Sequence, residues 1–355
     1  MTQATKQATM RAMRLTGTRR MEMQDVAAPA LVRDTDVLIR MARVGVCGSD
    51  VHYFAEGGIG SQRVEYPWTV GHEGAGIVER VGAAVTRVKP GDRIAFDPAR
   101  PCGVCDQCRA GRPHTCRALT FLGCPQQVEG CLAELLVMPE RSCYPFPDAM
   151  TFEEAALVEP LSIGLYALAL AGLRPGADVG ILGAGPIGLS VLLPARAGGA
   201  GRIYVTDLID ARLQVASRAG ADWTGNPDKE DVVGLVKLGE PELLDAVFEC
   251  SGAQEAMDQG VEMLKPGGTL LLVGIPGDRN RVSFDINLLR RKEICIQNVR
   301  RQNDCVQRAI DMIAHKEIDV GVMVTHRFPF SRTPEAFDLV ADYRDGVVKA
   351  MIEFE

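Results

Sequence analysis

A chain of 355 residues is longer than a single hydrophobic core usually requires, so two domains are expected. Its 46% hydrophobic and 24% charged residues are the composition of an ordinary globular protein. The formal net charge of -7 argues against a nucleic-acid-binding surface, which needs a concentrated basic face. The protein is therefore expected to act on a small molecule and to bind neither a nucleic acid nor a membrane.

The sequence contains 11 cysteines and no apolar signal segment, and a chain of this size can build a core without disulfides. We therefore expect a cytoplasmic protein. Residues 1–20 are basic and lack acids, so an organelle transit peptide is the alternative for that stretch. The longest apolar run, residues 179–195, contains glycines and Pro186, and we interpret it as a strand, a turn and a helix start rather than a membrane span.

Short segments of alternating apolar and polar residues fill the first part of the chain. This period of two is typical of half-buried strands, and it is clear in residues 37–41, 76–81 and 92–96. Residues 1–150 are therefore expected to form a mostly β domain.

Residues 44–79 concentrate side chains that bind metals. Cys47, His52, His72 and Glu73 bring one thiol, two imidazoles and one carboxylate into a short glycine-rich segment. Sulfur, nitrogen and oxygen donors together suit zinc. A structural zinc site closes itself with four Cys or His ligands, whereas one ligand of each kind leaves a position free for water or substrate. The segment thus predicts a catalytic zinc site, and ordinary packing residues are the alternative.

A second zinc site is predicted from four closely spaced cysteines, Cys102, Cys105, Cys108 and Cys116. Thiolates at this spacing can converge on one tetrahedral ion. A disulfide or redox pair is the alternative. Because four sulfurs leave no open position, this zinc is expected to be structural and to hold a loop that has little core of its own.

The other six cysteines share no spacing and are expected to be buried small hydrophobic residues. They are Cys124, Cys131, Cys143, Cys250, Cys295 and Cys305.

From Thr151 onward, short apolar runs alternate with amphipathic stretches, which is the pattern of βαβ units around a parallel sheet. A sheet of six strands is expected, with its last strand at an edge, and a helix near residues 305–316 then leads the chain back to the first domain. Strands are expected at residues 178–182, 202–206, 246–249, 268–274 and 293–298.

The first of these strands leads into a glycine-rich turn at residues 183–188, Gly-Ala-Gly-Pro-Ile-Gly. Gly183 and Gly185 permit a tight turn and close approach of a pyrophosphate to backbone N–H groups at a helix start, and Gly188 lets helix and strand pack closely. Pro186 and Ile187 complete the predicted cofactor-binding turn.

Asp207 stands at the end of the next strand, about 20 residues after the turn, where dinucleotide-binding folds carry an acid. Its carboxylate can accept hydrogen bonds from both ribose hydroxyls and would repel a 2′-phosphate, so NAD is the expected cofactor. The alternative is that Asp207 only caps a helix at residues 209–219.

The pattern Gly-x-Cys-Gly-Ser-Asp-x-His at residues 45–52, followed by Gly-His-Glu-Gly-x-Gly at residues 71–76, resembles the zinc-dependent medium-chain dehydrogenases. Within that family, Val51-His52-Tyr53, Pro67 and Glu159-Pro160-Leu161-Ser162 look most like the polyol dehydrogenases. The resemblance extends from about Met10 to the C-terminus.

The family resemblance implies an α/β protein with two domains. A mostly β, GroES-like catalytic domain is expected at residues 1–162 and 299–355, with the structural-zinc lobe at about 100–117. A Rossmann domain with a doubly wound, six-stranded parallel sheet is expected at residues 163–298.

The resemblance also implies a reaction. Zinc bound by Cys47 and His72 is expected to polarise the substrate hydroxyl, while hydride passes to NAD. Ser49, the nicotinamide ribose and His52 are expected to carry the hydroxyl proton to solvent. For His52, a surface histidine without this role is the alternative.

The third protein ligand of the catalytic zinc is open between Glu73 and Glu159. The polyol dehydrogenases use the glutamate that follows the histidine, and the equivalent of Glu159 holds the metal-bound water or substrate. Neighbouring side chains on a strand point to opposite faces, however, so His72 and Glu73 can share an ion only if the backbone turns. We expect both glutamates at the site, with Glu73 preferred as the ligand.

Further contacts follow from the same resemblance. Arg212 is expected to pair with Asp207 in a manner compatible with NAD. Substrate contacts are expected from Tyr53, Phe121, Glu159 and Arg300. The nicotinamide end is expected to be lined by Val273, Gly274, Ile275, Asn298, Val299 and Arg300.

Arg301 departs from the family pattern, because the polyol dehydrogenases usually have tyrosine at this position. A guanidinium there favours a longer, more oxygenated or anionic polyol, unless the side chain turns into solvent.

Taken together, the sequence predicts an NAD-dependent zinc polyol dehydrogenase that reversibly oxidises a secondary hydroxyl of a sugar alcohol to a ketose. Sugar alcohols of the sorbitol, xylitol, arabinitol or galactitol type are the expected substrates. Another alcohol or L-threonine dehydrogenase of the same architecture is the second hypothesis, and an inactive structural or regulatory relative is the third. The family suggests a homo-tetramer, and the sheet edge near residues 293–298 is expected to be covered by a partner.

Overall fold

The computed structural model describes residues 8–276 and 281–355. The chain divides into two compact units. The first unit runs to Glu159 and also includes His326–Arg344 and Ala350–Glu355, whereas the second comprises Pro160–Thr325 and Asp345–Lys349. The boundary between the units at residues 159/160 lies close to the expected domain boundary at residue 162. The boundary at residues 325/326 lies further along the chain than the expected one at residue 298.

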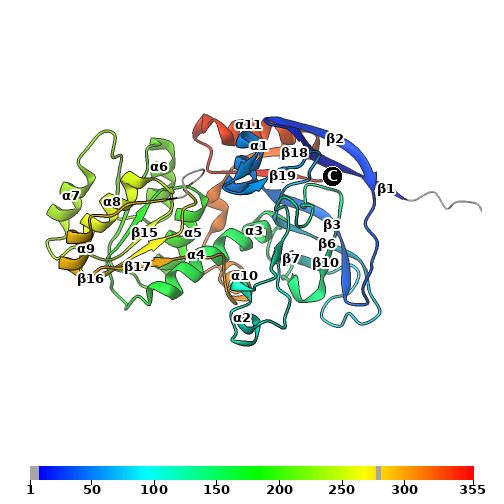
Figure 1. Cartoon of the computed structure of the whole chain (residues 1–355), viewed down its shortest axis with the longest axis horizontal. Coiled ribbons are helices and arrows are strands. Elements are labelled where there is room, and N and C mark those ends of the chain that lie inside the picture. Colours follow the sequence, from blue (N-terminus) through cyan, green and yellow to red (C-terminus); the bar gives the residue numbers. More distant parts are fainter. Residues whose placement is uncertain (1–7, 277–280) are drawn as a thin grey trace, which may run out of the picture. The chain divides into compact units, whose positions relative to one another are not determined.

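The first unit is built mainly of strands, as the alternating sequence predicts (Figure 1). Its strands are β1 (Thr9–Gly17), β2 (Arg20–Ala27), β3 (Asp36–Gly45), β4 (Gly58–Ile59), β5 (Gln62–Arg63), β6 (Glu73–Val81), β7 (Arg93–Phe96), β8 (Ala99–Arg100), β9 (Thr120–Phe121), β10 (Leu135–Pro139), β11 (Cys143–Pro145), β18 (Val324–Pro329) and β19 (Lys349–Glu353). Its helices are α1 (Gly48–Glu56), α2 (Asp106–Arg109), α3 (Phe152–Ala156) and α11 (Thr333–Ala341), with 3-10 turns η1 (Pro113–Thr115), η2 (Glu140–Ser142) and η4 (Phe330–Arg332).

Strand β3 is central to the main sheet of this unit. Among the described residues the sheet has seven strands in the order β11-β7-β6-β3-β19-β18, and β10 also pairs with β3. The pairing of β3 with β6 is antiparallel and sets Gly45 opposite Glu73. That register brings the end of β3 beside the start of β6, where the predicted zinc ligands lie.

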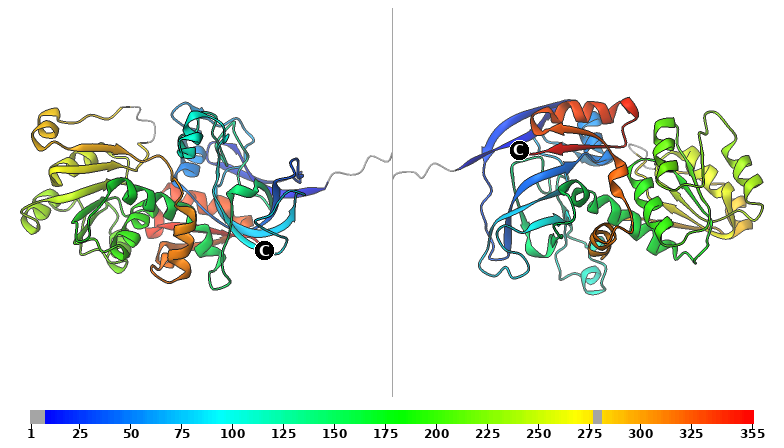
Figure 2. Two further views of the ribbon diagram at one scale, coloured as in Figure 1. Left: turned by 90° about the horizontal axis from the view of Figure 1, so that it is seen from below. Right: turned by 180° about the vertical axis from the view of Figure 1, so that it is seen from behind.

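Strands β1 and β2 form an antiparallel hairpin, drawn in dark blue in Figure 2. Met13 and Leu15 of β1 are buried, and their backbone N–H groups donate to Leu132 and Trp68. Residues 9–20 are therefore part of the folded unit. Residues 1–7 of that stretch lie outside the described residues.

The second unit is an α/β fold around a parallel sheet. Its strands are β12 (Val179–Leu182), β13 (Ile203–Thr206), β14 (Trp223–Gly225), β15 (Leu244–Glu249), β16 (Leu264–Leu272) and β17 (Cys295–Asn298). Its helices are α4 (Val158–Ala171), which crosses the boundary, α5 (Pro186–Ala197), α6 (Asp210–Arg218), α7 (Val232–Gly239), α8 (Gln254–Met263), α9 (Ile286–Lys292) and α10 (Val306–Ala314), with 3-10 turns η3 (Val320–Met323) and η5 (Arg344–Gly346).

The strand order of this sheet is β14-β13-β12-β15-β16-β17, with all described neighbours parallel. In order of appearance this is 3-2-1-4-5-6, the doubly wound arrangement of dinucleotide-binding domains. The expected strand segments and the helix near residues 305–316 are confirmed, and β17 is an edge strand as expected. Strand β14 was not delineated from the sequence, because three residues are too few to show a period.

The long apolar run at residues 179–195 is a strand followed by a helix, as predicted: β12 ends at Leu182 and α5 begins at Pro186. No helix in residues 8–276 or 281–355 combines the length and apolarity that crossing a membrane requires.

All 11 cysteines lie among the described residues, and no disulfide joins any two of them. Cys124, Cys131 and Cys143 are buried as expected, and Cys250 and Cys305 are partly buried. The expectation is wrong for Cys295, which is exposed because it lies on the edge strand β17.

Candidate functional site

Cys47, His72 and Glu73 come together in the first unit. Each offers one ligand atom, and the three atoms lie within 4.8 Å of one another. Cys47 follows β3 and is the N-cap of α1, while Glu73 is the first residue of β6. A helix N-terminus favours negative charge and thus the thiolate that binds a metal. One sulfur, one nitrogen and one oxygen fit a zinc ion that keeps an open position.

The backbone before β6 explains how neighbouring residues can face one ion. His72 precedes the strand, so the alternation of a strand does not apply between it and Glu73. Gly71, just before His72, has φ 101°, a conformation that disfavours other residues. A Cβ at Gly74, just after Glu73, would lie 2.8 Å from Phe96 Cζ. Glycine is therefore needed on both sides of the His-Glu pair.

Asp50 is a residue of this site that the sequence reasoning did not assign. It is fully buried on α1, and its Oδ1 lies 3.3 Å from His72 Nδ1 and accepts a hydrogen bond from the Gly71 backbone N–H at 3.1 Å. This contact leaves His72 Nε2 for a metal and fixes the orientation of the ring. The available signal was the aspartate in the Cys-Gly-Ser-Asp motif.

The electrostatics of the site favour a cation. Burial lowers the pKa of His72, but the charges of Asp50 and Cys47 outweigh that effect and leave the pKa well above its ordinary value. The Oδ2 atom of Asp50 is also buried, with no hydrogen-bond partner among the described residues. Buried negative charge of this kind is stabilised by a bound divalent ion.

Ser49 and Phe121 lie in direct contact with the predicted ligands. Ser49 Oγ is 3.4 Å from Cys47 Sγ. The centroids of the Phe121 and His72 rings are 5.2 Å apart. His52 lies one turn along α1, partly exposed, with its Nδ1 2.9 Å from Glu56 Oε1.

Tyr53 is more enclosed than a typical substrate-facing residue. Only 5% of it is exposed, and its hydroxyl lies 3.7 Å from Cys124 Sγ. Burial raises the pKa of Tyr53, with a further contribution from Cys124. The tyrosine is therefore neutral and held in place.

Glu159, the other candidate for third ligand, is buried near the start of α4. It is not a member of the metal-binding group that the described residues form around His72. The structure thus brings Glu73 to the ligand atoms and leaves Glu159 outside that cluster.

The four closely spaced cysteines, Cys102, Cys105, Cys108 and Cys116, form the second group. Their sulfur atoms also lie within 4.8 Å of one another. Cys105 Sγ is 3.6 Å from Cys108 Sγ and 3.8 Å from Cys116 Sγ. These distances exceed that of a disulfide and suit ligands around one ion.

The thiols of this lobe do not ionise alike without a cation. Backbone N–H groups of Arg117 and Cys108 lower the pKa of Cys105 to about 6, whereas desolvation raises that of Cys108 to about 12. Four thiolates together require a metal to neutralise them. Nearby, Arg117 Nη2 donates to Asp106 Oδ2 at 2.8 Å and closes the lobe.

The glycine-rich turn has the geometry that close packing requires. Gly183 has φ 108°, and Gly185 is the N-cap of α5, with Pro186 as its first residue and Ile187 as its second. A Cβ at Gly188 would overlap the carbonyl oxygen of Gly183. The N-terminus of α5 is thus open to a phosphate group.

Asp207 follows β13, and each of its two carboxylate oxygens accepts a hydrogen bond from a backbone N–H group. Its Oδ2 accepts a hydrogen bond from Ala184 N at 2.7 Å, and its Oδ1 accepts one from Ile209 N at 2.8 Å. The N-cap of α6 is Ile209, so Asp207 is not the capping residue of that helix. The carboxylate is instead tied to the glycine-rich turn.

Arg212 lies against the same turn. It is 8% exposed, its Nε donates to the carbonyl of Val347 at 2.9 Å, and its Nη1 would lie 3.6 Å from a Cβ at Gly185. The guanidinium is therefore held by the backbone beside the turn.

The remaining predicted cofactor residues follow the last two strands of the sheet. Val273, Gly274 and Ile275 follow β16, and Ile275 is 50% exposed. Asn298 ends β17 and the chain continues through Val299, Arg300 and Arg301. Arg300 is exposed, whereas Arg301 is partly buried and has φ 55°.

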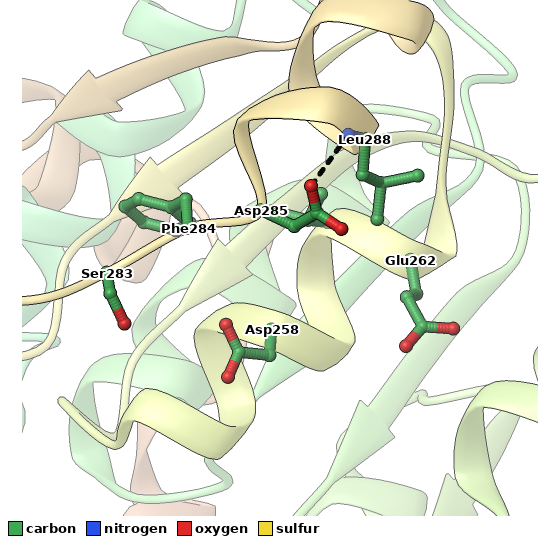
Figure 3. Close-up of a pocket in the computed structure, with 7 residues that line it drawn as sticks. Asp258, Glu262, Ser283, Phe284, Asp285 and Leu288 are labelled. Atoms are coloured by element: carbon green, nitrogen blue, oxygen red, sulfur yellow. Dashed lines mark hydrogen bonds between the residues drawn. The ribbon is translucent and has the colours of Figure 1, made fainter.

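A surface hollow of about 440 Å³ in the second unit lies between α8 and the start of α9 (Figure 3). Its acids already have partners: Asp285 caps α9 through Leu288 N, Glu262 pairs with Lys237, and Asp258 accepts from Gln254. None of the predicted site residues lines it. We therefore do not assign this hollow to the active site.

Two family models match this chain. Residues 33–148 match the alcohol dehydrogenase GroES-like domain, and residues 186–315 match the zinc-binding dehydrogenase domain. The chain belongs to the zinc-dependent medium-chain dehydrogenases. It is 33% identical over 344 residues to a sorbitol dehydrogenase of Bacillus subtilis, covering 97% of both chains.

Two further relatives bear on the cofactor and the substrate. A putative D-xylulose reductase of Rhizobium meliloti is 38% identical over 335 residues, covering 94% of this chain and 96% of the relative. A putative zinc-binding dehydrogenase of Sinorhizobium meliloti, solved with NADP bound, aligns with a TM-score of 0.89 at 30% identity, over 98% of this chain and 100% of that one. Zinc and a nicotinamide dinucleotide are therefore the cofactors of this family member.

Proposed function

We propose that this enzyme is an NAD-dependent zinc polyol dehydrogenase that reversibly oxidises a secondary hydroxyl of a sugar alcohol to a ketose. The observation that carries the proposal is the group of Cys47, His72 and Glu73, which has the donor set of a catalytic rather than a structural zinc. Relatives named sorbitol dehydrogenase and D-xylulose reductase, each matched over most of its length, support the polyol class.

The residues of the site divide the work as follows. Zinc supplies a Lewis acid that lowers the pKa of the substrate hydroxyl. Cys47, His72 and Glu73 are proposed to hold it, and Glu159 to hold the substrate or water beside it. Asp50 fixes the His72 ring through the Nδ1 contact.

The proton of the hydroxyl is proposed to leave through Ser49 and His52. Ser49 is close to the ligands, because its hydroxyl contacts Cys47 Sγ. His52 is partly exposed on the same helix and has Glu56 as a partner, so it can pass a proton to water.

NAD rather than NADP is proposed as the cofactor. Asp207 is held at the end of β13 by the N–H groups of Ala184 and Ile209, where a carboxylate repels a 2′-phosphate. Arg212 is tied to the Val347 carbonyl, which limits its freedom to turn toward such a phosphate. Because a relative binds NADP, the two cofactors have to be compared directly.

For the substrate, contacts are proposed from Tyr53, Phe121, Glu159, Arg300 and Arg301. Phe121 contacts the His72 ring, which supports a position beside the reacting carbon. Arg301 is proposed to favour longer, more oxygenated or anionic polyols. The variant R301Y tests this, because an unchanged substrate ranking contradicts it.

We also propose a cytoplasmic homo-tetramer. Strand β17 ends the described sheet and exposes Cys295, and exposed sheet edges are commonly covered by a partner. A mass that stays monomeric at every concentration in light scattering contradicts the tetramer.

The central experiment follows the absorbance of reduced nicotinamide with metal-replete enzyme. Sorbitol, xylitol, galactitol, the arabinitols and ribitol are compared with each of NAD and NADP, and L-threonine and simple alcohols serve as controls. We expect turnover of at least one polyol, with kcat/KM higher for NAD. Turnover of threonine alone, or of no compound, rejects the proposal.

A further inference from the structure

Glu249 is a buried acid to which no role has been assigned so far. It is the last residue of β15, and it is 0% exposed. Burial raises the pKa of Glu249, and hydrogen bonds from Ser251 and Gly252 oppose that rise. A buried ionisable group lowers the stability of the fold unless neighbouring groups form hydrogen bonds or ion pairs with it.

The hydrogen bonds of Glu249 join two loops. Its Oε1 accepts from Ser251 N and Oγ, both at 2.6 Å, and from Gly252 N at 2.7 Å. Its backbone carbonyl accepts from Val273 N at 2.8 Å and Gly274 N at 2.9 Å. One residue thus fixes both the loop after β15 and the loop after β16.

These loops lie too close together for side chains. A Cβ at Gly274 would lie 2.8 Å from Glu249 Oε2 and would overlap Gly252 N. Gly252 has φ 75°, and a Cβ there would overlap the carbonyl oxygen of Ile275. A small shift of the carboxylate therefore displaces both loops.

The glycine-rich turn belongs to the same cluster. A Cβ at Gly183 would lie 3.1 Å from Ser251 N, and Cys250 N donates to the carbonyl of Leu182 at 2.8 Å. The loops after β12, β15 and β16 thus pack against one another, with Glu249 among them.

The strands that these loops follow indicate which half of the dinucleotide the loops would contact. Ligands of this fold bind at the carboxyl ends of the strands, across the switch between β12 and β15. The glycine-rich turn and Asp207 belong to the β12–β14 half, which takes the pyrophosphate and the adenosine ribose. The nicotinamide half of a bound dinucleotide would therefore lie over the half that begins with β15.

We propose that Glu249 is a positioning residue for the nicotinamide half of the cofactor site, because its carboxylate binds the loop at residues 250–253 and packs against Gly274 of the loop at residues 273–275, which its backbone carbonyl also holds. Its Oε2 is buried against Gly274, with no hydrogen-bond partner among the described residues. The inference rests on the dinucleotide use described above and adds a residue that acts through the loops rather than by touching substrate.

The test compares three variants. E249A removes the carboxylate, and E249Q keeps an acceptor oxygen in a side chain of the same size but removes the charge. D245N is the matched control, because Asp245 stands at the amino end of the same strand, where it pairs with Lys265 and accepts from Asp178 N at 3.0 Å. For each variant, dissociation constants for NADH and ADP are measured by fluorescence, together with kcat, both KM values and the melting temperature.

We expect E249A to weaken NADH binding about tenfold and to leave ADP binding within about twofold, because ADP has no nicotinamide half. E249Q is expected to lie between wild type and E249A, at roughly two- to fivefold for NADH, since a neutral acceptor makes weaker hydrogen bonds than a carboxylate. D245N is expected to lower the melting temperature without changing the NADH to ADP ratio.

Equal weakening of NADH and ADP, or no weakening of NADH in a folded E249A, overturns the proposal. If E249A does not fold, E249Q decides: an NADH affinity within the error of wild type then rejects the role. The polyol function fails separately, because wild-type protein that binds NADH but turns over no polyol contradicts that function and leaves the Glu249 result intact.

Discussion

The two metal-ligand groups of the first unit would bind zinc in opposite ways. The catalytic group of Cys47, His72 and Glu73 sits at the junction of β3, α1 and β6, and the last two residues are 5% and 1% exposed. The four-cysteine lobe sits on short α2 and η1, and only Cys116 among its ligands is buried.

The difference shows what each group requires of the fold. Three mixed ligands leave an open position, so the rest of the protein must hold them by burial, by glycine turns and by the Asp50 contact. Four sulfurs complete the coordination by themselves, so the lobe needs little core and the metal substitutes for it. Variants of the first group should therefore change catalysis, and variants of the second should change stability.

The largest effect is expected for H72A at the catalytic group. Loss of the imidazole removes a zinc ligand and with it several kcal/mol of transition-state stabilisation, so kcat/KM should fall on the order of 10³-fold or more. Activity with the preferred polyol and zinc content by mass spectrometry are the measurements. Zinc should fall from about two ions to about one per chain, while the lobe keeps its own. Retained activity with one zinc ion contradicts the assignment of this group as catalytic.

A smaller loss is expected for D50N. The carboxylate that orients His72 Nδ1 becomes an amide, and changes of this kind typically cost roughly 10- to 100-fold in metal affinity or activity. Titration of the apoenzyme with zinc and kcat/KM at saturating zinc measure the two components. D106N, an acid of the other group, is the control; equal effects of D50N and D106N on catalysis contradict the positioning role.

The sequence predicts those features of the two groups and of the fold that have a local spacing or period. The four cysteines carry their own spacing, so the sequence predicts that their sulfur atoms converge, and the parallel sheet follows from alternating apolar runs. Strand β14 was not delineated, because Trp223–Gly225 is too short for a period and is defined by its pairing with β13.

Contacts between distant residues were harder to foresee. The approach of His72 and Glu73 to Cys47 depends on the register that sets Gly45 opposite Glu73, and no local pattern encodes a register. Asp50 and Glu249 act through hydrogen bonds that only the folded chain creates. The exposure of Cys295 likewise depends on its position in an edge strand and not on its apolar neighbours.

A loss of stability rather than of chemistry is expected for C105S in the four-cysteine lobe. A missing sulfur opens the coordination of a zinc that replaces a core, so the lobe at residues 102–116 should loosen. We expect a lower melting temperature and protease cleavage within the lobe, with kcat of the folded enzyme within about twofold of wild type because the other zinc retains its ligands. Loss of kcat without loss of stability reverses the assignment of the two groups.

The smallest effect is expected for D106N in the same lobe. Asp106 and Arg117 form an exposed ion pair, and such pairs contribute little, so we expect a change in melting temperature of about 1 °C in calorimetry. Hydrogen bonds from Arg117 and Gln107 hold the pKa of Asp106 below its usual range, so its contribution is present above the ordinary pKa of an aspartate and is lost as pH falls through the depressed value. The difference between D106N and wild type should therefore shrink both in acid and in high salt, which screens the pair. A shift as large as that of C105S means that the ion pair, and not the metal, holds the lobe together.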